Sequence, residues 1–245
     1  MHAIISALAA RHGLSKSEVL EEIEAAFSEA LSRWHRLEVL VHVRGDLSLE
    51  AVAYNRVSGV TLQKLVDLPA LLHRASVTMA LEQHLALAAV RKLVRRYKVC
   101  EKTLLWGEVM GRRAGQDMYV TTEILPGEWI TAVCPVNRIG LHERDSDRFR
   151  PGRRCAFHLR RVEPVLVNNT PRTKVVLDRV SKTLTETLLR YHLGEAAHRY
   201  PFRCLKRYVG HKSIVLSTRK LPREVIIAVD RELRERVQVR IVRQL

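Results

Sequence analysis

The alternation of hydrophobic and polar residues predicts five short strands in the middle of the chain, between Glu101 and Val180. They are expected at Thr103–Arg112, Met118–Thr122, Trp129–Val136, Cys155–Val162 and Lys174–Val180. Gly107 and Gly111 lie inside the first, and glycine within a strand pattern marks a bulge or sharp bend. Five strands in about 80 residues, with one long connection between the third and fourth, are typical of an OB-type barrel. A sandwich usually needs about seven.

Two turn signals support this arrangement. The first pair of strands joins through Ala114-Gly115-Gln116-Asp117. The fourth strand is entered through Phe149-Arg150-Pro151-Gly152, where proline presets the turn and glycine can take a positive φ.

Ahead of the strands, apolar residues at helical spacing predict a helix from Ser15 to about Trp34. Ser15 and Glu18 form a capping-box pattern, with Leu14 placed to contact Val19. The acidic residues fall largely outside the apolar stripe; they are Glu21, Glu22, Glu24 and Glu29. This acidic surface is either a solvated face that complements the helix dipole or a docking surface for a partner.

A hairpin and a second helix complete an N-terminal α/β domain at 1–100. The hairpin is expected at Glu38–Arg44 and Leu47–Tyr54 around Gly45-Asp46, and the helix at Ser76 to about Lys98. Residues 60–75 are apolar, are interrupted by Pro69, and match no clear period.

The C-terminal region has an α-β-β-α-β pattern. Its elements are expected at Ser181–Ala197, Phe202–Val209, Ser213–Thr218, Pro222–Glu235 and Val237–Val242. This order predicts a small sheet covered by helices on one face. The sequence therefore predicts a multidomain α+β protein with domains at 1–100, 101–180 and 181–245.

The net charge of the chain indicates which class of partner it binds. The 245 residues carry a formal net charge of +16, which indicates a polyanionic partner, nucleic acid first and an anionic membrane second. The excess of Lys and Arg over Asp and Glu is +3 for residues 1–100, +4 for 101–180 and +9 for 181–245.

No pattern of catalysis or cofactor binding is found. The four cysteines form no C-x-x-C pair, the histidines are scattered, and no P-loop, H-E-x-x-H or G-x-S-x-G motif occurs. With no signal peptide and no apolar run of about 18 residues, we expect a cytoplasmic protein with reduced thiols, no metal, no cofactor, no membrane partner and no enzymatic activity.

The basic residues of the predicted barrel indicate a groove for single-stranded nucleic acid. The expected RNA contacts are Arg112, Arg113, Tyr119, Arg148, Arg150, Arg153, Arg154, Arg160, Arg161, Arg172 and Lys174. Trp129 and Phe157 are further candidates for base stacking, although a core position is the better interpretation of Trp129.

The order of the three segments resembles the bacterial transcription factor NusA family over almost the whole chain. The resemblance rests on the capped helix Ser15–Trp34, the helix leading into Trp106-Gly107-Glu108-Val109, the turn Phe149-Arg150-Pro151-Gly152-Arg153-Arg154, and Val180-Ser181-Lys182. It implies an N-terminal domain, a ribosomal-S-one-type OB domain and a first KH domain.

The resemblance also implies partners. In that family the N-terminal domain docks on RNA polymerase, and the OB and KH domains bind emerging RNA to modulate pausing, termination and antitermination, beside other factors of the transcription complex. We therefore expect the acidic surface of Glu21, Glu22, Glu24 and Glu29 to contact polymerase.

Two departures mark a shortened variant. Arg219-Lys220-Leu221-Pro222 replaces the G-x-x-G loop of a KH domain, and a second KH domain does not follow Val237–Val242. RNA binding by 181–245 is then expected to be diffuse and sensitive to salt.

Two other functions stay open. One is a basic RNA- or DNA-binding repressor or translation factor that does not contact polymerase. The other is an RNA-processing enzyme with the barrel as its substrate module, which would need a catalytic constellation.

Overall fold

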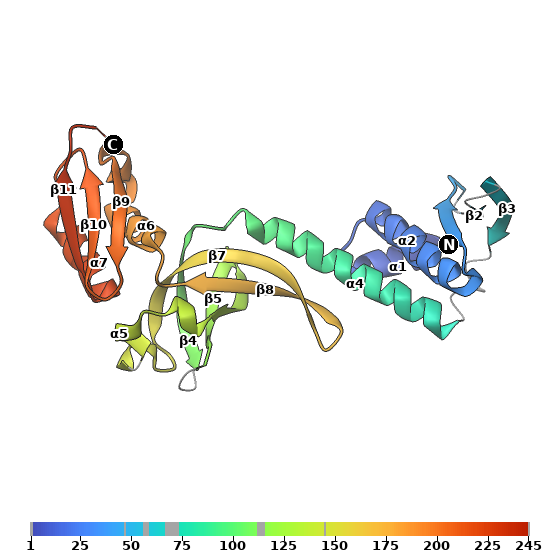
Figure 1. Ribbon diagram of the computed structural model, residues 1–245, viewed down its shortest axis with the longest axis horizontal. Coiled ribbons are helices and arrows are strands. Elements are labelled where there is room, and N and C mark those ends of the chain that lie inside the picture. The colour runs from blue at the N-terminus through green and yellow to red at the C-terminus, as the bar shows by residue number, and fades with distance from the viewer. Residues whose placement is uncertain are drawn as a thin grey trace. The chain divides into compact units, whose positions relative to one another are not determined.

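The computed structural model describes residues 2–46, 48–55, 59–66, 74–111, 116–144 and 146–244. They form a mixed α+β fold with three sheets, one of them five-stranded, which confirms the predicted α+β class. The chain divides into two compact units. The first comprises residues 1–95 with 164–173, and the second comprises 96–163 with 174–245. Figure 1 labels the elements of both.

The first unit contains helices and a three-stranded antiparallel sheet. Its elements are α1 (His2–His12), α2 (Lys16–His35), β1 (Glu38–Val43), β2 (Leu49–Asn55), β3 (Gly59–Val66) and the greater part of α4 (Ala75–Lys98). The capping box is confirmed, because Glu18 N donates to Ser15 Oγ at 3.2 Å and Ser15 N donates to Glu18 Oε2 at 2.7 Å. The hairpin and both predicted helices are present, whereas α1 and β3 were not predicted.

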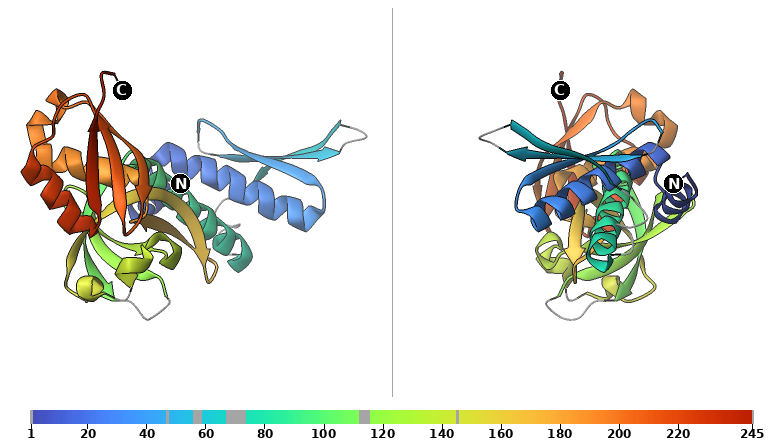
Figure 2. Two further views of the ribbon diagram at one scale, coloured as in Figure 1. Left: turned by 60° about the vertical axis from the view of Figure 1, so that its left-hand side comes forward. Right: turned by 90° about the vertical axis from the view of Figure 1, so that its right-hand side faces the viewer.

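Helix α2 protects the edge of this sheet (Figure 2). Strand β1 is an outer strand, and every second backbone amide of it faces α2. Val39 N, Val41 N and Val43 N donate to Ser32 Oγ, Ser28 Oγ and Glu24 Oε1 at 2.8, 2.8 and 2.7 Å. Side chains one helical turn apart thus satisfy edge amides that would otherwise be open to pairing with another strand.

The five-stranded sheet, which belongs to the second unit except for residues 164–173, closes into a barrel in the order β4-β5-β6-β8-β7. The strands are β4 (Leu104–Gly111), β5 (Met118–Leu125), β6 (Glu128–Cys134), β7 (Arg154–Val167) and β8 (Thr170–Asp178). All five occur at the predicted places. The long connection between β6 and β7 contains η1 (Val136–Arg138), α5 (Leu141–Arg144) and η2 (Asp147–Phe149), which were not predicted.

Two local features explain the strand shapes. The register of β4 against β5 shifts between Val109 and Gly111, so the bulge that glycine in this strand indicated is present. Strands β7 and β8 run beyond their predicted ends because Asn168 and Asn169 both take positive φ, 49° and 61°, as a two-residue type I′ hairpin requires.

The C-terminal part has the predicted α-β-β-α-β order. Its elements are α6 (Lys182–Leu193), η3 (Gly194–Arg199), β9 (Phe202–Tyr208), β10 (Lys212–Ser217), α7 (Arg223–Leu233) and β11 (Arg236–Ile241). The sheet order is β11-β10-β9, with β10 parallel to β11 and antiparallel to β9. Both helices lie against one face of the sheet (Figure 1), and their apolar residues share one core with Phe202, Val215 and Val237.

A completely buried arginine joins the barrel to this C-terminal part. Arg179, directly after β8, uses all five guanidinium N–H groups. They donate to both carboxylate oxygens of Glu143 at 3.0 and 2.5 Å, to Glu232 Oε1 and Glu232 O at 3.1 Å, and to Ala156 O at 2.6 Å. Three segments of the unit therefore meet at one side chain: α5, β7 and α7.

Two further contacts stabilise this cluster. The rings of Phe149 and Phe157 lie 5.4 and 5.6 Å from the guanidinium carbon, within the range of cation–π attraction. Burial alone would raise the pKa of the Glu232 carboxyl, but Arg179 and Arg148 outweigh burial and hold that pKa below its ordinary value. The Glu232 carboxyl is therefore held in its ionised form by the two arginines of the cluster.

Over the described parts of the chain, no helix combines the length and the apolar character needed to span a bilayer.

We predict that Arg179→Met lowers the free energy of unfolding of the second unit by about 3 to 5 kcal/mol, because it removes five hydrogen bonds and leaves Arg148 to compensate both Glu143 and Glu232, the former only at 3.8 Å. Chemical denaturation monitored by tryptophan fluorescence measures the change. Adding Glu143→Leu should recover part of the loss by removing a buried charge that Arg148 contacts only at 3.8 Å. The exposed substitution Arg231→Met is the control. A loss below about 1 kcal/mol would show that the cluster is not required for stability.

Candidate nucleic-acid interface

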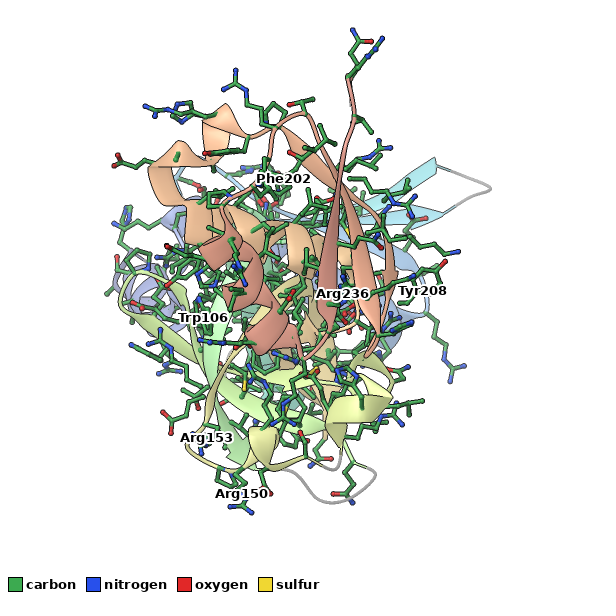
Figure 3. All side chains as sticks on the ribbon, turned by 90° about the vertical axis from the view of Figure 1, so that its left-hand side faces the viewer. Trp106, Arg150, Arg153, Phe202, Tyr208 and Arg236 are labelled. Atoms are coloured by element: carbon green, nitrogen blue, oxygen red, sulfur yellow. The ribbon has the colours of Figure 1, made fainter. Side chains whose placement is uncertain are left out.

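The turn directly before β7 fixes the positions of Arg150 and Arg153 (Figure 3). Arg153 N donates to Arg150 O at 3.1 Å, and Gly152 has φ 82°, which is the glycine position of a type II turn. The turn is tied to β4, since Gly152 N donates to Val109 O and Val109 N donates to Arg153 O, both at 2.9 Å. The predicted Pro-Gly turn is confirmed, and it holds its arginines against the barrel.

Four arginines line one cavity of about 230 Å³ in the second unit. The lining residues are Asp147, Arg148, Arg153, Arg154, Cys155 and Arg234. Three of the arginines are exposed, and Arg234 projects from the left-handed C-cap of α7 with φ 51°. Four guanidinium groups around one small cavity are suited to a phosphate group, because each offers several N–H donors at fixed angles.

Arg148 is different from the other three. Its side chain is only 18% exposed, and it is held by ion pairs with Glu232 and, at 3.8 Å, Glu143. The expectation that Arg148 contacts RNA is therefore not supported by its surroundings, which give it a structural role in one wall of the cavity.

A row of paired residues connects the cavity to the outer face of the barrel. Arg154 on β7 lies opposite Glu108 on β4, which in turn lies opposite Thr121 on β5. Thr121 lies opposite Thr131 on β6. Residues opposite one another in a sheet share a face, so the exposed basic edge and the face of β4, β5 and β6 form one continuous surface.

Two aromatic side chains lie on this barrel face, on either side of that row. Tyr119 and Trp129 are 55% and 62% exposed, and Met110, at the bulge of β4, is also exposed. The expected core position of Trp129 is wrong, because its pairing with Glu123 puts it on the outward side of β6. Phe157 is completely buried and cannot stack on a base. Exposed aromatic rings are the groups on which unstacked bases pack.

The other predicted cations are less concentrated. Arg160 and Arg161 on β7 form ion pairs with Asp178 and Glu163 at 3.2 and 3.1 Å. Lys174 on β8 is half-buried. Arg172 belongs to the first compact unit. Arg112 and Arg113 lie outside the described residues. The gathered site is therefore Arg153 and Arg154 with Tyr119, Trp129 and the exposed Arg150, which lies outside the cavity and pairs with Asp147 at 2.7 Å.

The acidic residues of α2 are largely engaged within the first unit. Glu22 contacts His84 and Arg91 at 3.3 and 3.8 Å, and Glu29 contacts Arg33 and His84 at 2.5 and 3.0 Å. The hydrogen bond with His84 is the main reason why the pKa of Glu29 is below its ordinary value. Glu24 binds the amide of Val43. Glu21 is exposed and forms no hydrogen bond or ion pair with another described residue.

Other reactive groups do not gather. Within the described ranges, no three His, Cys, Asp or Glu side chains are placed to hold a metal ion. The cysteines are free thiols, and burial raises the pKa of Cys155 and brings that of Cys204 to about 11.

Comparison of the chain with protein-family models and with curated protein sequences finds no match.

Sequence reasoning missed two residues of this region. Arg234 completes the cavity from the end of α7, and Arg179 holds α7 in place. Neither stands in a local motif, and the partners of Arg179 lie 23, 36 and 53 residues away along the chain. Only the three-dimensional packing brings them to the site.

We predict that the triple variant Arg150→Gln, Arg153→Gln, Arg154→Gln weakens binding of single-stranded RNA. Each lost phosphate contact should reduce the slope of log affinity against log salt by ~0.7, so the slope should fall by about 2. Fluorescence anisotropy over a salt series measures it. The charge-matched control is the exposed set Lys220→Gln, Arg223→Gln, Arg231→Gln. An equal fall in the control would remove these arginines from the interface.

Aromatic stacking gives a separate prediction. Tyr119→Ala and Trp129→Ala should each lower RNA affinity by about 1 to 3 kcal/mol while leaving the salt slope unchanged, because stacking involves no counterion release. Leu141→Ala, an equally exposed apolar substitution away from the sheet face, is the control. Unchanged affinity in both aromatic variants would show that bases do not pack on this face.

Proposed function

We propose that the protein binds single-stranded RNA through the outer face of the barrel and acts on RNA polymerase as a regulator of transcription similar to NusA. The observation that carries the RNA-binding part is the continuous surface of exposed arginines and exposed aromatic rings on β4 to β7. Cations that bind the backbone, next to rings that stack on bases, are the chemistry by which proteins hold single strands.

The finer fold assignments belong to this proposal. A five-stranded barrel with one long connection before its fourth strand supports an OB-type domain. An α-β-β-α-β segment supports a KH-like domain in which β10 leads through residues 218–222 directly into α7. That connection contains no glycine, so it supplies no G-x-x-G clamp for RNA phosphates.

The polymerase-binding part rests on the order of the three segments and on the acidic surface of α2. A second function, RNA or DNA binding by a repressor or translation factor without polymerase contact, is favoured by one observation. Glu22, Glu24 and Glu29 already bind groups of their own unit, which leaves Glu21 as the carboxylate best placed for a partner.

Binding to purified core RNA polymerase separates these functions. We predict that Glu21→Lys with Glu29→Lys weakens association with polymerase at least tenfold, because both carboxylates reach solvent and both changes reverse charge. Glu24 is left intact because it binds the edge strand. The control is Glu195→Lys with Glu224→Lys, two exposed carboxylates of the second unit. RNA binding by the wild-type chain with no measurable polymerase binding would support the second function.

A further inference from the structure

The sheet of β9, β10 and β11 has one face that its own helices do not cover. Helices α6 and α7 pack against Cys204, Val215 and Val237 on one side. Side chains alternate between faces along a strand, so the neighbours of these residues point to the opposite side. The register places the opposite-side residues in three rows: Tyr208, Lys212 and Arg236; Lys206, Ile214 and Gln238; Arg203, Leu216 and Arg240.

Five cations and no acid lie on this open face. Arg203, Lys206, Arg236 and Arg240 are exposed and Lys212 is half-buried. The sequences of the three strands contain no Asp or Glu. None of the five cations forms an ion pair with another described residue, whereas the inward-facing Arg207 is fully paired with Glu235. Arg236 interacts electrostatically with the carboxylate of Asp230 on α7, and the face as a whole is a strongly positive surface.

The arrangement of the cations suits an extended strand of phosphates. Rows in a sheet repeat every two residues, about 6.6 to 6.8 Å, and cations stand at both outer strands of the sheet. Arg236 and Arg240 line one outer strand, and Arg203 and Lys206 line the other. A polyanion that crosses the sheet would therefore contact a cation on each of the two outer strands.

The centre and one corner of the face offer surfaces for bases. Ile214, which is only 9% exposed, and the half-buried Leu216 form an apolar floor along the middle strand. Tyr208 is 41% exposed, with Lys206 Nζ 4.8 Å from its ring centre. Figure 3 shows Tyr208 and Arg236 on the two outer strands. Aromatic and apolar contacts flanked by cations are how sheet surfaces hold unstacked bases.

We propose that this open face is a second binding surface for single-stranded RNA, separate from the barrel face and from the loop where a KH domain would clamp phosphates. It replaces the diffuse attraction expected from sequence with a located site. The inference rests on the proposed function only for the ligand, RNA, and does not depend on polymerase contact. An anionic membrane surface is the competing ligand, but membrane-surface binding usually uses an amphipathic helix with a large apolar face, not a sheet.

The test uses the full chain, a short fluorescent single-stranded RNA of mixed sequence, and anisotropy over a salt series. The variant Lys206→Gln, Lys212→Gln, Arg236→Gln should lower the slope of log affinity against log salt by about 2. The helix-side control Lys220→Gln, Arg223→Gln, Arg231→Gln removes the same charge next to the missing KH loop and should change the slope by less than half as much. If the triple variant is unfolded by circular dichroism, Arg203→Gln with Arg240→Gln is measured instead, with an expected fall of about 1.4.

Tyr208→Leu separates RNA recognition from simple attraction of anions. It should weaken RNA binding about tenfold and leave binding of polyglutamate unchanged, because polyglutamate has no bases to stack. Equal slopes in the sheet variant and the helix-side control would overturn the proposal. So would loss of binding to phosphatidylserine vesicles in the sheet variant while RNA binding is retained.

Comparison of the barrel variant with the sheet variant separates failure of the proposed function from failure of this inference. If Arg150→Gln, Arg153→Gln, Arg154→Gln weakens RNA binding but the sheet variant does not, the proposed function stands and this inference fails. If both variants weaken binding and their effects add, there are two separate surfaces. If the wild-type chain binds no RNA, both proposals fail.

Discussion

The second unit depends on the buried guanidinium of Arg179. A charge removed from water is costly unless it is paired and all of its donors are satisfied, and Arg179 meets both conditions through Glu143, Glu232 and Ala156 O. The adjacent Asp178 accepts the amides of Val180 and Ser181, which start α6. Two consecutive residues therefore fix the exit of β8, the start of α6 and the position of α7. Since α7 carries Arg234 into the cavity and covers one face of β10, both proposed RNA surfaces depend on this cluster.

Sheet edges are protected by helix side chains in both units. In the first unit, α2 satisfies the amides of β1 with two serines and Glu24. In the second, Glu186 of α6 accepts the amide of Cys204 on β9, and Asp230 of α7 accepts that of Val237 on β11. Three edge amides of β1 and one each of β9 and β11 are thus bound by helix side chains, which discourages pairing with another molecule at these positions.

The features that could be predicted from the sequence are those formed by residues close together along the chain. The capping box at Ser15 and the turn at Gly152 depend on residues within four positions of one another, so their patterns were readable. Trp129 was misplaced because a single residue of strand register decides whether a side chain faces the core or solvent. Strand β3 was missed because its apolar residues showed no clear alternation. The cavity needs Arg234 beside Arg153, and nothing local in the sequence connects the turn before β7 with the end of α7.

The same internal contacts explain why the positive charge is concentrated on particular surfaces. Residues 181–245 contain six acidic side chains, and four of them serve the interior: Glu186 and Asp230 bind edge amides, Glu232 pairs with Arg179, and Glu235 pairs with Arg207. Glu195 and Glu224 are left at the surface. Apart from the interaction of Arg236 with Asp230, the cations on the open sheet face form no ion pair with a described carboxylate. A surface of mixed sign mainly promotes solubility, whereas a surface of one sign attracts a polyanion over a Debye length of about 10 Å at 0.1 M salt. The arrangement that stabilises the fold is thus also the one that leaves the proposed RNA-binding face strongly positive.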